Sequence, residues 1–84
     1  MIHNHGRIGN LTKEMQSLIY RIAASELVNG RDIVLRECSD EELQFAFWGG
    51  TQREHIIPED ITGEIISETF GVSCVQDRHL FTIK

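Results

Sequence analysis

The chain has 84 residues, of which 40% are hydrophobic and 25% charged, and a formal net charge of −5 at pH 7. This length suits one small domain over residues 1–84, and the composition argues against an intrinsically disordered chain. The longest apolar runs are far shorter than the roughly 18 residues of a membrane-spanning helix. Because the N-terminus also lacks an apolar signal segment, we expect a cytoplasmic protein.

A long amphipathic helix is predicted between Asn10 and Gly30, after a flexible or extended N-terminal segment at residues 1–9. Either Asn10 or Thr12 can cap its start, and Asn29 with Gly30 supplies a left-handed exit. Six apolar side chains recur at helical spacing. They are Leu11, Met15, Leu18, Ile19, Ile22 and Leu27.

The run DIVL favours a strand because it is rich in β-branched residues, whereas the following segment, CSDEELQFAFWGG, is ambiguous. Ser39 followed by Glu42 is typical of a helical capping box, and Gly49 could end such a helix. Strict alternation of apolar side chains favours a strand instead. The alternating residues are Leu43, Phe45 and Phe47. We therefore predict a strand over residues 43–48 that pairs with residues 33–37.

A second helix and a hairpin are predicted in the last third of the chain. Pro58 suits the first turn of a helix, the acidic residues behind it suit the helix dipole, and Gly71 suits its end. Residues 72–84 alternate in a way that is typical of a hairpin, with the turn near Gln76 and Asp77.

These elements predict an α+β domain of order α-β-β-α-β-β, with two helices on one face of a mostly antiparallel sheet. If the ambiguous segment were helical, the order would become α-β-α-α-β-β. That alternative is the order of a winged helix, which is a DNA-binding shape.

Acidic residues concentrate in the middle of the chain. Residues 37–68 hold nine carboxylates and a single base, Arg53, a balance of −8, whereas residues 1–36 have a balance of +2. In the winged-helix alternative, the groove-binding helix would carry four acids and no base, so DNA phosphates would repel it. These acids are Glu59, Asp60, Glu64 and Glu68. Nucleic acid is therefore not the expected partner.

Three of these acids would form a ladder along one face of the second helix. Asp60, Glu64 and Glu68 stand at positions i, i+4 and i+8, with neighbours separated by roughly 6 Å along the helix axis. Such a row could steer the protein to a basic surface, and the alternative is an ordinary solvated helix face.

Two further features could contribute to a binding surface. Asp40, Glu41 and Glu42 form an acidic cluster nearby in the sequence. In the strand interpretation Trp48 points away from Phe45 and Phe47, where it could anchor a partner or cover the far face of the sheet.

The N-terminal residues resemble a chelate for copper(II) or nickel(II). A free amine on Met1, two amides and the imidazole of His3 stand in the required order, with His5 close by. Any chain with a histidine at its third position has this property, so we expect no biological metal site and no cofactor. A zinc site from His3, His5, Cys38 and Cys74 would need a ligand spacing unlike that of zinc fingers.

Catalytic motifs are scarce in the sequence. If Gln76 and Asp77 form the hairpin turn, Cys74 faces His79 across the strands, which would place a thiol beside a base. A packed, slowly reacting thiol is the more common outcome for such a residue. No Walker loop, GxGxxG or HExxH motif is present.

The sequence therefore predicts a small acidic, non-enzymatic binding protein whose acidic surface recognises a basic protein partner, as an inhibitor or nucleic-acid mimic would. The alternative is a winged-helix-like transcriptional regulator that contacts nucleic acid through basic residues such as Arg7, Arg78 and Lys84. A thiol enzyme based on Cys74 and His79 is a third interpretation. Homodimerisation is left open.

Overall fold

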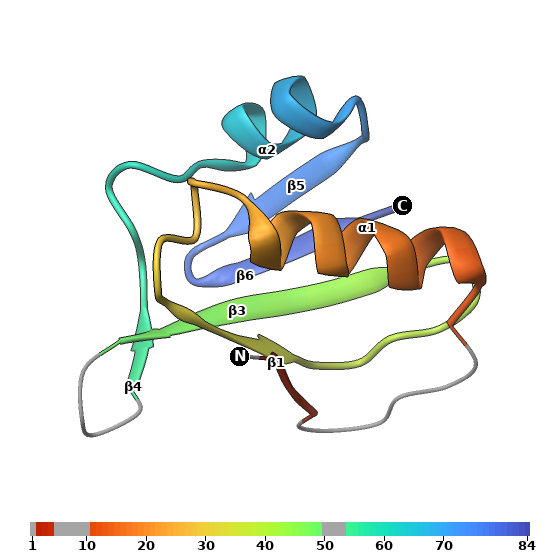
Figure 1. Cartoon of the computed structure of the whole chain (residues 1–84), viewed down its shortest axis with the longest axis horizontal. Helices are drawn as coiled ribbons and strands as arrows, with labels where there is room; N and C mark the ends of the chain where they lie inside the picture. The colour runs from red at the N-terminus through yellow and green to blue at the C-terminus, as the bar shows by residue number, and fades with distance from the viewer. Residues whose placement is uncertain (1, 5–10, 50–53) are drawn as a thin grey trace.

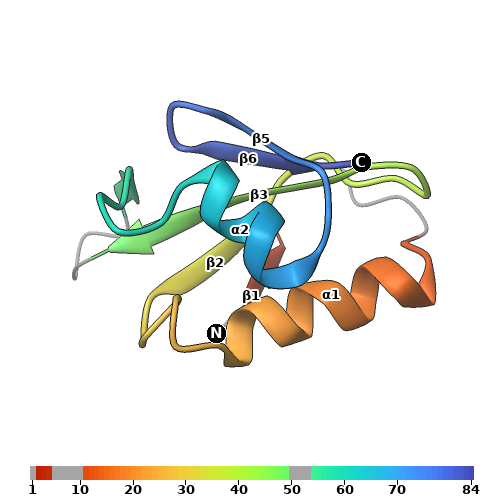
Figure 2. The same cartoon turned by 90° about the horizontal axis from the view of Figure 1, so that it is seen from above.

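The computed structural model describes residues 2–4, 11–49 and 54–84. Two helices lie on one side of a six-stranded sheet, as Figures 1 and 2 show from two directions. In chain order the elements are β1 (Ile2–Asn4), α1 (Lys13–Ala24), β2 (Asp32–Leu35), β3 (Leu43–Gly49), β4 (Glu54–Ile56), α2 (Gly63–Phe70), β5 (Cys74–Asp77) and β6 (Leu80–Ile83). The predicted α+β class and mostly antiparallel sheet are confirmed.

Strand β3 is the centre of the sheet. Along one side it pairs with β2, and along the other it pairs first with β6, through Leu43–Phe45, and then with β4, through Phe47–Gly49. β6 and β4 therefore follow each other end to end along the same side of β3. The sheet order is β1-β2-β3-β6-β5, and all pairs are antiparallel except β1 with β2.

The ambiguous segment is a strand, as its alternation predicted. Val34 lies opposite Ala46 and Leu35 opposite Phe45 in the ladder between β2 and β3. The capping-box residues Ser39 and Glu42 instead bond to each other through their backbones in the turn between these strands. The winged-helix order is therefore wrong. Strands β1 and β4, each of three residues, were not predicted as strands.

The core lies between the helices and the sheet. The rings of Phe45 and Phe81 stack at 5.3 Å between their centroids, and Phe47 meets Phe81 edge-on at 5.5 Å. Ile22 of α1 and Ile66 of α2 cover these rings from the helical side, and both are almost fully buried. Burial of such side chains supplies most of the favourable free energy of folding.

Helix α1 begins where the sequence indicated but ends earlier. Thr12 caps its start by accepting a hydrogen bond from the Met15 amide at 3.1 Å. At its end, the hydroxyl and the amide of Ser25 both donate to the Ile22 carbonyl, and Ser25 has extended backbone. A serine side chain that competes for a helical carbonyl in this way disfavours continuation of the helix. Asn29 and Gly30 do have positive φ, but they serve the turn before β2.

Helix α2 begins five residues later than Pro58, which is a second correction. Thr62 is the N-cap and accepts a hydrogen bond from the Ile65 amide at 3.2 Å, while Pro58 is buried upstream of the helix. The end was predicted correctly, since Gly71 adopts the left-handed conformation with φ of 67°. A threonine cap outweighs the weaker preference of proline for a first turn.

The hairpin turns two residues later than predicted. Asp77 pairs with Leu80, so the turn consists of Arg78 and His79. Arg78 has a φ of 55°, a conformation that its side chain does not favour and that the sequence did not indicate. Within residues 2–4, 11–49 and 54–84, neither helix is long and apolar enough to cross a membrane.

Candidate functional site

Helix α2 is fixed against the edge strand β5. Ser67 Oγ accepts a hydrogen bond from the Cys74 amide at 3.0 Å and donates to the Cys74 carbonyl at 3.4 Å. At the start of the helix, the Gly63 amide donates to Gln76 Oε1 at 3.1 Å. A Cβ at position 63 would lie 3.2 Å from backbone atoms of Cys74 and Gln76, so glycine permits this close approach. The outer face of α2 is thereby held in a defined orientation.

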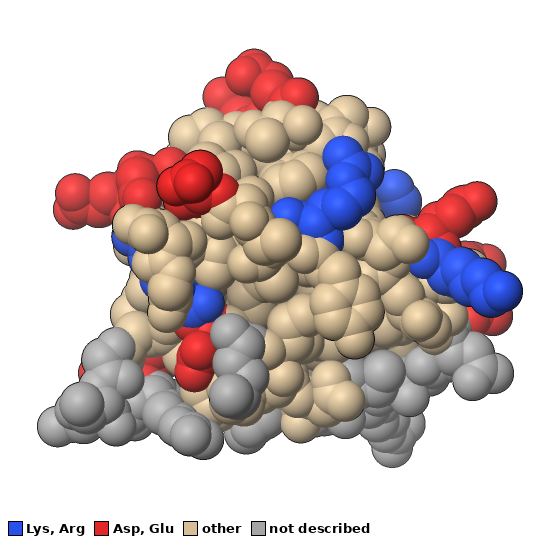
Figure 3. All heavy atoms as spheres, viewed as in Figure 1, with Lys and Arg blue, Asp and Glu red and all other residues tan. Residues whose placement is uncertain are grey.

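That outer face carries Glu64 and Glu68, one helical turn apart and both exposed. Neither carboxylate forms an ion pair with any residue that the structure describes. Figure 3 shows acidic side chains at the top of the molecule, over α2, and basic side chains below them towards α1. On that side Arg21 of α1 lies over the ring of Phe70, 5.5 Å from its centroid. Two carboxylates that are unpaired among the described residues thus project from a helix that hydrogen bonds hold to β5.

Asp60 is not part of a ladder with Glu64 and Glu68, because it precedes the helix. Its carboxylate instead accepts hydrogen bonds from Arg31 Nη2 at 3.0 Å and Nη1 at 3.2 Å. These bonds from Arg31 lower the pKa of Asp60. Arg31 also donates to the Leu27 carbonyl. The ion pair of Arg31 and Asp60 therefore connects the segment that precedes α2 to the segment that precedes β2. The predicted three-residue alignment is therefore wrong, and two members of it remain.

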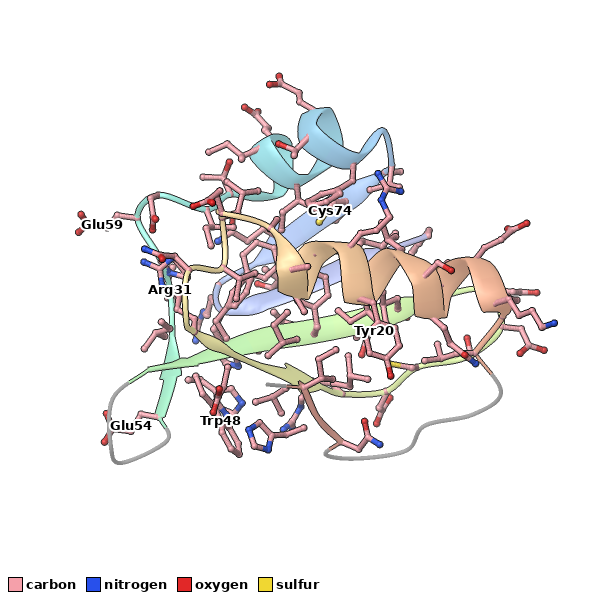
Figure 4. The ribbon with its side chains drawn as sticks, viewed as in Figure 1. Tyr20, Arg31, Trp48, Glu54, Glu59 and Cys74 are labelled. Carbon is pink, nitrogen blue, oxygen red and sulfur yellow. The ribbon has the colours of Figure 1, made fainter. Side chains whose placement is uncertain are left out.

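Glu59 is the other acid beside α2. It is exposed, and Figure 4 shows its side chain pointing outward from the segment that leads from β4 to α2. Because it lies outside the helix, it does not continue the row of Glu64 and Glu68.

Asp40, Glu41 and Glu42 belong to a different part of the surface. They lie in the turn between β2 and β3, and Figures 1 and 2 both show this turn well away from α2. Glu42 accepts a hydrogen bond from Gln44 Nε2 at 2.9 Å and lies 3.9 Å from the ammonium group of Lys84. The acidic middle of the sequence therefore divides into two separate surfaces.

Trp48 covers the face of the sheet that the helices leave free. Only 8% of the residue is exposed, its ring stacks on His3 at 5.3 Å, and the ring of His55 meets it edge-on at 6.2 Å. It therefore does not present the exposed anchor considered above. Tyr20 on α1 is 67% exposed, and sequence patterns did not single it out. Figure 4 labels its side chain below α1.

Three histidines meet on this helix-free face. His3 Nε2 lies 3.0 Å from Asp32 Oδ2, and beyond Trp48 the ring of His55 stacks on that of His79 at 4.7 Å. Proximity to His3 lowers the pKa of Asp32. No sequence motif predicted this row, because its members are far apart in the chain and only the strand pairing brings them together.

Metal binding finds no support in the described part of the chain. There, no group of three or more histidine, cysteine or acidic side chains is placed to hold a metal ion. Met1 and His5, which would complete the predicted copper(II) or nickel(II) chelate, lie outside the described residues. Cys38 is buried and donates through its thiol to the Gln44 carbonyl.

The predicted thiol and base are also apart. Cys74 pairs with Ile83, so His79 lies at the other end of the hairpin. Burial raises the pKa of the Cys74 thiol to about 11, which leaves it protonated at neutral pH. The two residues therefore do not form the nucleophile and base that a thiol enzyme would need.

The basic residues of the nucleic-acid alternative do not converge either. Arg78 and Lys84 lie at opposite ends of β6, and Lys84 is close to Glu42. Arg7 lies outside the described residues. Comparison of the chain with protein-family models, curated proteins and solved structures found no match.

Proposed function

We propose that the protein is a non-catalytic binding protein, which recognises a basic macromolecular partner through the exposed face of α2. The observation that supports this proposal is the pair Glu64 and Glu68, held one turn apart on a helix that side-chain and backbone hydrogen bonds fix to β5. Like charges at this spacing repel by a few tenths of a kcal/mol, and the helix dipole offsets only part of this cost at Glu64 in the first turn. The two carboxylates would instead contribute to binding, by pairing with basic side chains of a partner.

A partner with a basic surface, such as a nucleic-acid-binding protein, fits this face best. Carboxylates about 6 Å apart along a helix match the separation of phosphates along a nucleic-acid strand. An inhibitor of such a partner would use the overall charge of −5 to accelerate association. Because the same charge repels phosphates, direct binding to nucleic acid is the weaker alternative.

The test compares two variants of equal charge. The first, Glu64→Gln with Glu68→Gln, removes the proposed face, and the control, Glu14→Gln with Glu26→Gln, removes two exposed acids on and just beyond α1. Each variant and the original protein are immobilised and exposed to an extract of the native host. A partner that binds the original and the control but is lost with the α2 variant supports the proposal.

Kinetics with that captured partner provide the second readout. The α2 variant should associate more slowly at low ionic strength, and the difference from the control should shrink as salt screens the charges. Equal capture and equal association rates for the two variants would show that Glu64 and Glu68 are an ordinary solvated face. The proposal would then be wrong.

A further inference from the structure

The row of rings on the helix-free face connects four parts of the sheet. It begins with His3 in β1, crosses Trp48 in β3 and His55 in β4, and ends with His79 in the turn between β5 and β6. β4 and this turn meet here because β4 and β6 occupy successive stretches of the same side of β3. The stack of His55 on His79 therefore spans the junction between β4 and the hairpin.

We propose that the stacked pair His55 and His79 is a pH-sensitive contact, which holds β4 against the hairpin turn at neutral pH and releases it on acidification. Two neutral imidazoles can stack at a centroid separation of 4.7 Å and at 26° between their planes. Two imidazolium ions at the same separation repel each other. Histidine changes its charge between about pH 5 and 8, so acidification converts an attractive contact into a repulsive one.

The charged groups around the pair do not cancel this repulsion at His79. Glu54 precedes His55 in β4, and Asp77 and Arg78, of opposite charge, precede His79 in the hairpin. Within the described part of the chain, no carboxylate lies within ion-pair distance of His79. The separated form therefore binds protons more readily than the stacked form. Because of this linkage, the contact between β4 and the turn weakens as the pH falls.

At the other end of the row, acidification has the opposite effect on the contact. His3 lies 3.0 Å from the carboxylate of Asp32, so protonation of His3 creates an ion pair and strengthens the attachment of β1 to β2. Acidification from pH 7.5 to 5 should thus loosen β4 while β1 stays in place. This contrast within one row separates the proposed contact from general acid unfolding, and the proposal is independent of the acidic face of α2.

The experiment measures the proton nuclear Overhauser effect between the rings of His55 and His79 in the full chain at pH 7.5 and pH 5. The effect between His3 and Trp48 is the internal control. Repulsion of two unit charges at this separation in water shifts the equilibrium between stacked and separated forms on the order of fivefold. We expect the His55–His79 effect to weaken on acidification while the His3–Trp48 effect persists.

His79→Phe tests the mechanism, because it keeps an aromatic ring in the stack but prevents a second charge. The ring-to-ring effect at this pair should then persist at pH 5, and His55→Phe should give the same result from the other side. His3→Phe should leave the response of the pair intact. The proposal would be overturned if the effect between rings 55 and 79 were absent at pH 7.5 or unchanged at pH 5 in the original protein. It would also be overturned if the phenylalanine variants lost this effect at pH 5 to the same extent.

Discussion

The side chain of Ser67 binds both backbone groups of Cys74, accepting from the amide and donating to the carbonyl. The Lys84 amide donates to the neighbouring Ser73 carbonyl, so in the antiparallel ladder the groups of Cys74 point away from β6, towards the free edge of the sheet. Helix α2 thus closes an edge that could otherwise pair with another chain.

Replacing Ser67 by alanine should therefore destabilise the protein by about 1–2 kcal/mol, since two partly buried backbone groups lose their partner. Urea unfolding measures the change in the free energy of unfolding. Ser17→Ala, at an exposed position of α1, is the matched control and should change stability by only about 0.5 kcal/mol or less. Equal stabilities of the two variants would mean that water replaces Ser67 without loss.

Asp60→Asn should reduce the loss of stability at acid pH. The pKa of Asp60 is lowered by Arg31 in the folded protein, so its ion pair contributes stability above the unfolded pKa and loses it as pH falls through the folded value. Thermal unfolding at pH 7 and pH 3 should show a smaller difference for the variant than for the original. Glu59→Gln, one residue away and outside any described ion pair, should keep the original difference.

The thiol of Cys74 should react slowly with a thiol reagent at pH 7.4. Its pKa of about 11, raised by burial, leaves far less thiolate than an unfolded cysteine has, so labelling should be slowed on the order of 100-fold or more. A Cys38→Ala background isolates Cys74, and the same protein in denaturant gives the reference rate. Labelling as fast in the native as in the denatured protein would contradict the burial seen here.

Glu64→Gln with Glu68→Gln should fold normally and gain up to a few tenths of a kcal/mol, because the substitution removes repulsion between two exposed carboxylates. Glu64 lies in the first turn of α2, where the helix dipole favours an acid, so part of this gain is offset. Thermal unfolding of this variant beside Glu14→Gln with Glu26→Gln checks the result. A clear loss of stability would mean that these acids support the fold.

The sequence predicted those elements whose pattern is long or strongly alternating. Leu43, Phe45 and Phe47 identified β3 because all three side chains enter the core from one face. β1 and β4 were missed because three residues carry too little pattern, and their pairing depends on β2 and β3, which lie elsewhere in the chain. Short edge strands are defined by their neighbours more than by their own residues.

Errors at the helix ends had a different origin, namely competition between local signals. Pro58 and Thr62 both mark a helix start, and the side-chain cap of Thr62, together with the packing of Gly63 against β5, places the start at Gly63. That shift removed Asp60 from the predicted ladder, so an error of a few residues changed the candidate site. The histidine row could not be predicted, because it needs the register of β3 with β4 and of β5 with β6.

The position of β3 also affects how the chain folds during synthesis. Its pairing with β6 joins Leu43 to Ile83, and Phe81 supplies the ring that stacks on Phe45. Until β6 has left the ribosome, part of one side of β3 has unpaired backbone groups and an incompletely covered aromatic face. A nascent chain in that state exposes surface of the kind that aggregates or recruits chaperones.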